Sequence, residues 1–169
     1  MYTQIEIKAD GSSLFRAVAT GILMKQNSNG LSKRAVSALS SELRQKVVDR
    51  MERKSKTNKS YLALLDGPTY LKRMRKRSTR AGVKETTMLH KLIRAEYKRY
   101  FPGGLAVHVI RKTNAIGHHT EVLVCMTGER NDSLFNVETQ LNVIMDTNTN
   151  HFDLLWLNYP KSNVSMLLK

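Results

Sequence analysis

Features that define several classes of proteins are scarce or missing in this chain of 169 residues. Its single cysteine, Cys125, excludes an internal disulfide framework and fits a reducing compartment. The longest apolar stretches are only a few residues long, too short to span a bilayer, and the first residues lack the basic and then apolar run of a signal peptide. We therefore expect a soluble protein of the cytoplasm.

Acidic residues are also scarce. The chain has 14 Asp and Glu against 28 Lys and Arg, which leaves a formal net charge of +14, and such a charge attracts polyanions. Many of the cations lie in the run from Lys72 to Arg80. This run is either a solvated face of short helices or a surface for nucleic acid, anionic lipid or acidic protein. It lacks the interleaved aromatic residues that stack bases, so it specifies no ligand by itself.

The apolar content, at 41%, is enough for one core. We expect a single domain over residues 1–169. Helical periodicity dominates the first hundred residues. One helix begins within residues 10–13 and stops at residues 27–30, a second spans residues 32–53, and others lie between residues 59 and 100, with breaks at residues 66–68 and 82.

Strand patterns follow in the second part of the chain, separated by turn residues. They cover residues 105–110, 121–126, 134–139, 141–145 and 151–157. Helices first and strands second indicate an α+β domain, in which a mainly antiparallel sheet is backed by helices.

A possible nucleophile lies where the first helix begins. Ser13 follows Asp10, Gly11 and Ser12 and precedes an apolar helical stripe. At the first turn of a helix, unpaired backbone amides and the positive end of the helix dipole favour an anion and supply oxyanion donors. The same sequence is also an ordinary helix cap, so it needs a partner elsewhere in the chain.

A possible general base lies near the other end of the chain. His151 follows a polar loop and opens the last expected strand, so its imidazole can lie at the rim of the sheet. Asp153, two residues further on, points to the same side of the strand and can orient the ring. Alone, His151 would be a loop or core histidine. Together with Ser13 it is a candidate nucleophile-and-base pair.

Five segments resemble the ovarian tumour (OTU) family of cysteine deubiquitinases. Residues 10–17 (Asp-Gly-Ser-Ser-Leu-Phe-Arg-Ala) resemble the signature Asp-Gly-Asn-Cys-Leu-Phe-Arg-Ala, and residues 151–153 resemble the His-aromatic-Asp/Asn strand that carries the base of the family. Residues 70–74 are similar to Tyr-Leu-x-x-Met, residues 80–85 to Trp-Gly-Gly-x-x-Glu, and residues 106–110 to the Ile-x-Val strand.

The chain departs from the family pattern at four of these positions. Ser13 stands where the family has its nucleophilic cysteine, and Ser12 where it usually has asparagine. Arg80 replaces the tryptophan and Ala81 the first glycine, so the sequence resembles a divergent member.

The resemblance implies a papain-like OTU domain that hydrolyses isopeptide bonds at the C-terminus of ubiquitin or a ubiquitin-like modifier. Position 13 would attack the carbonyl, His151 would take and return the proton, and Asp153 would orient the imidazole. The expected partner is ubiquitin or a polyubiquitin chain. We expect a monomer that needs no cofactor and no metal. By analogy, a compact and divergent domain suits a viral protein or a bacterial effector in the host cytoplasm.

The resemblance also assigns roles to residues around this pair. Asp10 would shape the loop, and the backbone amides of Gly11, Ser12 and position 13 would stabilise the oxyanion. Glu85 and Arg80 are expected to contact the substrate. In addition, the run from Lys72 to Arg80 is a possible polyanion contact.

Ser13 itself has three explanations. It is an engineered cysteine-to-serine change, a natural change in a member that has lost activity and kept binding, or the nucleophile of a retuned serine hydrolase. We favour the first, because His151 and Asp153 are both in place. A serine hydroxyl has far less anionic character than an activated thiol, so we expect this form to be inactive or very slow. The alternative function is an inert OTU-like module that binds ubiquitin or, through its basic face, nucleic acid.

Overall fold

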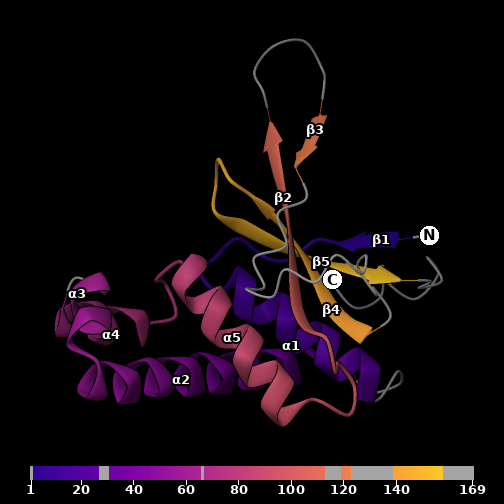
Figure 1. The fold of residues 1–169 in the computed structure, drawn as a ribbon. Coiled ribbons are helices and arrows are strands. Elements are labelled where there is room, and N and C mark those ends of the chain that lie inside the picture. The colour runs from indigo at the N-terminus through magenta and orange to yellow at the C-terminus, as the bar shows by residue number, and fades with distance from the viewer. Residues whose placement is uncertain (1, 27–30, 66, 113–118, 123–138, 158–169) are drawn as a thin grey trace.

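The computed structural model describes residues 2–26, 31–65, 67–112, 119–122 and 139–157 (Figure 1). Within these ranges the chain forms ten elements. In order they are β1 (Tyr2–Ile5), α1 (Ser13–Gln26), α2 (Lys33–Thr57), α3 (Lys59–Leu64), α4 (Pro68–Met74), α5 (Val83–Glu96), β2 (Gly104–Lys112), β3 (His119–Val122), β4 (Gln140–Asp146) and β5 (His151–Leu157).

The strands form one mixed sheet in the order β1-β5-β4-β2-β3. β2 and β4 run parallel, whereas the other three neighbouring pairs are antiparallel. The prediction of an α+β fold with a mainly antiparallel sheet is confirmed. The last residue of β4, Asp146, is paired with the first residue of β5, His151, so His151 lies at the edge of the sheet where β5 begins.

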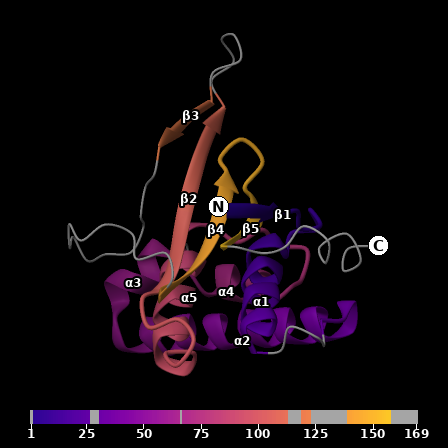
Figure 2. The ribbon, with the colours of Figure 1, turned by 90° about the vertical axis from the view of Figure 1, so that its right-hand side faces the viewer.

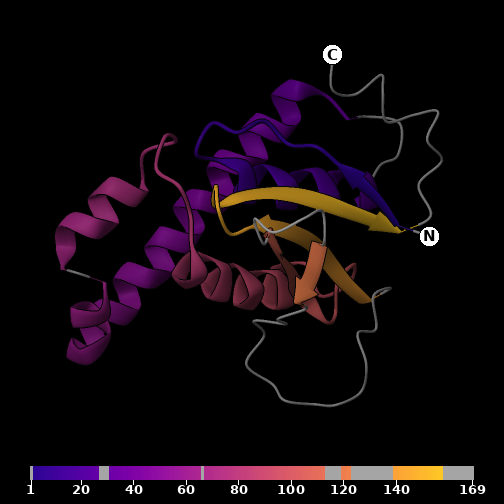
Figure 3. The same cartoon turned by 90° about the horizontal axis from the view of Figure 1, so that it is seen from above.

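The helices lie on one side of this sheet (Figure 1). α1 packs against β5 and β4, and α5 packs against β2. α2 packs against both of these helices, furthest from the strands (Figure 2). Seen from above, α1 and α5 lie side by side, and α3 and α4 sit at one end of α2 (Figure 3). The packing of α1 on β5 brings the two ends of the expected site together.

Apolar periodicity and caps explain where the main helices form. The stripe of α2 includes Leu43, Val47 and Met51, which are fully buried, while its opposite face is charged. Ser32 caps this helix by accepting a hydrogen bond from the amide of Ala35 at 3.1 Å. α4 begins with Pro68, whose ring suits the first turn of a helix.

Several boundaries differ from the sequence-based predictions. α2 continues to Thr57 instead of ending at residue 53, and an ion pair between Glu52 and Lys56, one helical turn apart, supports the added turn. α5 ends at Glu96 rather than residue 100, because Tyr97 leaves the helical conformation. Two expected strands lie largely outside the described residues. They are residues 134–138 of the strand expected at 134–139, and the residues after 122, including Cys125, of the strand expected at 121–126.

No helix in the described part of the chain combines the length and the apolar character needed to cross a membrane. The single-domain organisation over residues 1–169 remains a prediction.

Candidate active site

The nucleophile loop, residues 10–13, leads directly into α1. The carbonyl of Ser12 accepts the first helical hydrogen bond, from the amide of Arg16 at 2.9 Å. Ser13 is therefore the first helical residue, and its amide has no partner within the helix. The side chain of Ser13 is mostly buried, with 6% of the residue exposed. Position 13 thus has the helix-start setting that the sequence predicts.

Gly11 gives this loop its sharp turn. Its φ of +82° lies in the left-handed region that side chains rarely adopt. A Cβ added there would also lie 2.3 Å from the carbonyl oxygen of Ser78. The loop can therefore press against the segment between α4 and α5 only with glycine at this position.

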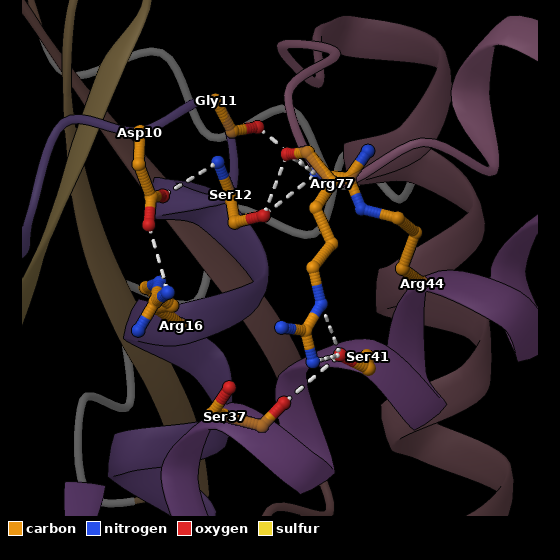
Figure 4. Close-up of polar contacts among 8 residues, drawn as sticks. All are labelled: Asp10, Gly11, Ser12, Arg16, Ser37, Ser41, Arg44 and Arg77. Atoms are coloured by element: carbon orange, nitrogen blue, oxygen red, sulfur yellow. Dashed lines mark hydrogen bonds and ion pairs between the residues drawn. The ribbon is translucent and has the colours of Figure 1, made fainter.

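Asp10 holds the loop from its outer side. One carboxylate oxygen accepts a hydrogen bond from the amide of Ser12 at 3.1 Å, and the other pairs with the Arg16 guanidinium at 2.7 Å (Figure 4). The Ser12 amide is thereby engaged, which corrects the expectation that it stabilises the oxyanion. In the described residues the amides of Gly11 and Ser13 have no hydrogen-bond partner, so these two remain available.

His151 and Asp153 form the expected pair on β5. The imidazole Nε2 lies 2.9 Å from a carboxylate oxygen of Asp153. The same oxygen accepts the amide of Ile7 at 2.7 Å, and the second oxygen accepts the side-chain amide of Gln4 at 2.9 Å. An ionised carboxylate only accepts hydrogen bonds, so Nε2 carries the proton and Nδ1 is left as the basic nitrogen.

A hydrogen bond joins the two halves of the site. The backbone amide of Phe152 donates to the hydroxyl oxygen of Ser13 at 3.2 Å, across 139 positions of sequence. Position 13 is thus tied to the residue that separates His151 from Asp153. Among the described contacts, no hydrogen bond joins the Ser13 hydroxyl to the imidazole itself. Catalytic hydrogen bonds are often long or poorly aligned before substrate binds.

Glu85 does not lie on a surface that a substrate could reach, since only 1% of it is exposed. One carboxylate oxygen accepts the Gly82 amide at 2.8 Å, which caps α5, and the other accepts the hydroxyl of Tyr70. Burial and the neighbouring carboxylate raise the pKa of Tyr70. The expected substrate contact by Glu85 is wrong for this structure, because its carboxylate joins α4 to α5.

Arg80, the other expected substrate contact, is exposed. Its guanidinium donates to the carbonyl of Thr149 at 3.0 Å, in the turn just before His151. This contact connects the segment between α4 and α5 to the turn that precedes His151. A contact between Arg80 and a substrate remains a prediction.

Arg44 is the residue that the motifs missed. It comes from α2, is 1% exposed, and donates to carbonyl oxygens of both the nucleophile loop and the segment after α4 (Figure 4). Its burial lowers the pKa of Arg44, whereas the Glu85 and Asp10 carboxylates act in the opposite direction. The available signal was an arginine on the apolar face of α2, next to Leu43 and one turn before Val47 and Val48.

Comparisons with known proteins identify solved structures with a similar fold. No protein-family model matches the chain, and no curated protein sequence matches it. Solved structures do match. The OTU domain of OTUD1 is similar with a TM-score of 0.60 and 16% identity, over 92% of this chain and 86% of that one.

Two further similar structures come from other sources. The viral OTU domain protease from Taggert virus has a TM-score of 0.57 at 15% identity, over 95% of this chain and 82% of the viral one. An OTU deubiquitinase from Wolbachia pipientis wMel, in a structure bound to ubiquitin, has a TM-score of 0.58 at 13% identity, over 92% and 95%. The chain therefore has the fold of an OTU domain.

Proposed function

We propose that this chain carries the catalytic frame of a thiol-type deubiquitinase, which hydrolyses isopeptide bonds at the C-terminus of ubiquitin or a ubiquitin-like modifier. The observation that carries this proposal is the junction of position 13, at the start of α1, with the His151–Asp153 pair on β5. The OTU fold adds support, because similar structures include a deubiquitinase bound to ubiquitin.

The proposed reaction follows the geometry of the two segments. The side chain at position 13 loses its proton to Nδ1 of His151 and attacks the carbonyl carbon of the isopeptide bond. The resulting oxyanion is stabilised by the amides of Gly11 and Ser13 and by the positive end of α1. His151 then protonates the lysine amine as it leaves. Water, activated by the same imidazole, releases the modifier with a free C-terminal carboxylate.

Serine at position 13 makes this reaction slow. A thiol in this setting is readily ionised by a helix start and a histidine, whereas a hydroxyl remains almost fully protonated at neutral pH. We propose that Ser13 replaces a nucleophilic cysteine through an engineered change. The chain as written would then keep the shape of the site and bind substrate without appreciable turnover.

The test is to replace Ser13 with cysteine. We expect the Ser13→Cys variant to cleave a fluorogenic ubiquitin substrate and to form a covalent adduct with an electrophilic ubiquitin probe. The unchanged chain should do neither at a comparable rate, and His151→Ala in the cysteine background should abolish both. A folded Ser13→Cys variant that neither cleaves a panel of ubiquitin chains nor forms the adduct would refute the proposal.

A further inference from the structure

Arg44 makes an unusual set of contacts for a buried cation. One terminal nitrogen donates to the carbonyls of Met74 at 3.0 Å and Thr79 at 2.9 Å. The other donates to the Gly11 carbonyl at 2.9 Å, the Ser12 hydroxyl at 3.1 Å and the Arg77 carbonyl at 3.3 Å.

The aromatic ring of Phe15 covers the same guanidinium, with its centroid 4.6 Å from the central carbon. Burying a charge is costly unless its donors are satisfied, and here the described contacts are carbonyls, a hydroxyl and a ring rather than a carboxylate. The planar fork of donors is the property of arginine that these contacts use.

The Gly11–Ser12 peptide is the part of the site that this cation holds. Its carbonyl accepts from Arg44, while its N–H, on the opposite side, donates to Asp10 at 3.1 Å. A peptide unit is a rigid plane, so a hydrogen bond at each end fixes its orientation (Figure 4). Glycine allows many backbone conformations, and at Gly11 this freedom would otherwise let the plane rotate.

The locked peptide lies between the two amides that remain available in the loop, those of Gly11 and Ser13. Its orientation therefore sets how these two donors lie relative to each other. Oxyanion donors lower the barrier only when they are held in place before charge develops. The hydroxyl of Ser12 reinforces the arrangement, because it accepts from Arg44 and donates to the Arg77 carbonyl at 2.8 Å.

We infer that Arg44 is a positioning residue for catalysis, which holds the nucleophile loop in the conformation that presents the Gly11 and Ser13 amides to the oxyanion. This inference rests on the proposed function. Arg44 is too buried to contact the substrate, and α2, on which it lies, carries none of the reacting groups. Its proposed effect on catalysis therefore acts through the nucleophile loop.

The experiment compares Arg44→Lys and Arg44→Met with Arg53→Met, all in the Ser13→Cys background. Lysine keeps the charge but cannot span the five acceptors, and methionine keeps much of the apolar stem. Arg53 is an exposed arginine of the same helix and serves as the matched control. Circular dichroism and thermal melting establish that each variant is folded.

Three readouts separate positioning from general stability. We expect kcat to fall about 10²-fold in Arg44→Met and at least about tenfold in Arg44→Lys, with KM within about threefold, because the lost interaction acts on the transition state. Affinity for a ubiquitin C-terminal aldehyde, whose adduct carries an oxyanion-like oxygen, should fall in parallel. Alkylation of Cys at position 13 by iodoacetamide, which forms no oxyanion, should keep its rate within about threefold.

The outcomes are distinguishable. An inactive Ser13→Cys parent refutes the proposed function. If the Ser13→Cys variant is active, but Arg44→Lys and Arg44→Met have the same kcat as Arg53→Met, the role of Arg44 is overturned. Equal losses in turnover and alkylation, or failure of both variants to fold, would make Arg44 a determinant of general stability and would also overturn it.

Discussion

At the scale of single residues, Asp153 has two tasks that can be separated. It accepts a hydrogen bond from the protonated nitrogen of His151, and it also accepts the amide of Ile7, a contact that is buried. The first task concerns catalysis and the second concerns the anchoring of the chain after β1. An asparagine at this position retains one oxygen as the acceptor for both donors and loses only the acceptor for the Gln4 side chain, whereas alanine leaves all three donors unpaired.

We therefore predict that Asp153→Asn and Asp153→Ala differ strongly in the Ser13→Cys background. The asparagine variant should keep kcat/KM within about tenfold, since the ring stays oriented, while the alanine variant should lose roughly 10²-fold or more. Alanine should also lower the free energy of unfolding by about 1–3 kcal/mol, because the Ile7 amide loses its partner. Steady-state kinetics and urea unfolding measure the two effects. Equal kinetic losses in both variants would contradict an orienting role.

Residue-scale prediction from sequence succeeded where spacing along one element carries the information. His151 and Asp153 share a side of one strand, and Ser13 starts one helix, so local geometry was enough to place them. Spacing along α2 showed an arginine on the apolar face but not what Arg44 binds, because its acceptors are brought in from residues 11 and 74–79. Side-chain contacts across 30 or more positions follow from tertiary packing and not from a motif.

At the scale of elements, the start of α5 depends on a buried carboxylate. Glu85 accepts the Gly82 amide and the hydroxyl of Tyr70, so it caps α5 and ties it to α4. Glu85 itself is almost fully buried, whereas the residues that carry its two donors, Gly82 and Tyr70, are half-buried. The structure therefore gives Glu85 a role in stability.

We predict that Glu85→Ala lowers the free energy of unfolding by about 2–3 kcal/mol, through the loss of a helix cap and of a buried acceptor. Glu42→Ala, which removes an exposed partner of Lys46, should cost less than about 0.5 kcal/mol. In the Ser13→Cys background, KM for ubiquitin should stay within about twofold in the folded Glu85→Ala variant. A selective rise in KM with unchanged stability would restore the original assignment of Glu85 to substrate binding.

Element types followed from periodicity, but element partners did not. The stripes of α1, α2 and α5 and the start of β5 at His151 were visible in the sequence. The parallel pairing of β2 with β4 was not, because strand alternation tells which residues are buried and not which strand lies alongside. The end of α2 was also misplaced, since a polar, lysine-rich segment can be helical when ion pairs one turn apart support it.

At the scale of the whole molecule, the excess of positive charge is the feature that the proposed reaction does not use. The run from Lys72 to Arg80 divides into two groups of cations. Arg75 pairs with Asp49 at 2.8 Å and with Glu52 at 2.9 Å, and these carboxylates raise the pKa of Arg75. Arg77 and Arg80 donate to other parts of the protein, and Arg73 lies over the ring of Tyr70.

Lys72 and Lys76 are exposed and are better placed to meet a polyanion. We predict that replacing both with alanine weakens binding to a short DNA duplex and makes its salt dependence shallower by about two units of slope, since each phosphate contact contributes about 0.9. Arg75→Ala should weaken binding less and instead cost roughly 1 kcal/mol of stability, because its ion pairs lie within the protein and are partly exposed to solvent.

The matched control replaces two other exposed lysines, Lys91 within α5 and Lys98 just beyond its end, and removes the same net charge. If binding depended on total charge alone, the two double variants would weaken it equally, because the long-range field of the molecule changes by the same amount. A local surface predicts a larger loss for Lys72 and Lys76 at 150 mM salt, where screening limits each charge to about 8 Å. Titration of a fluorescent duplex at several salt concentrations separates the two.

In the Ser13→Cys background, cleavage of ubiquitin by the Lys72 and Lys76 double variant should remain within about threefold, since neither lysine contributes to the described active-site contacts. Loss of cleavage with unchanged DNA binding would assign this face to ubiquitin.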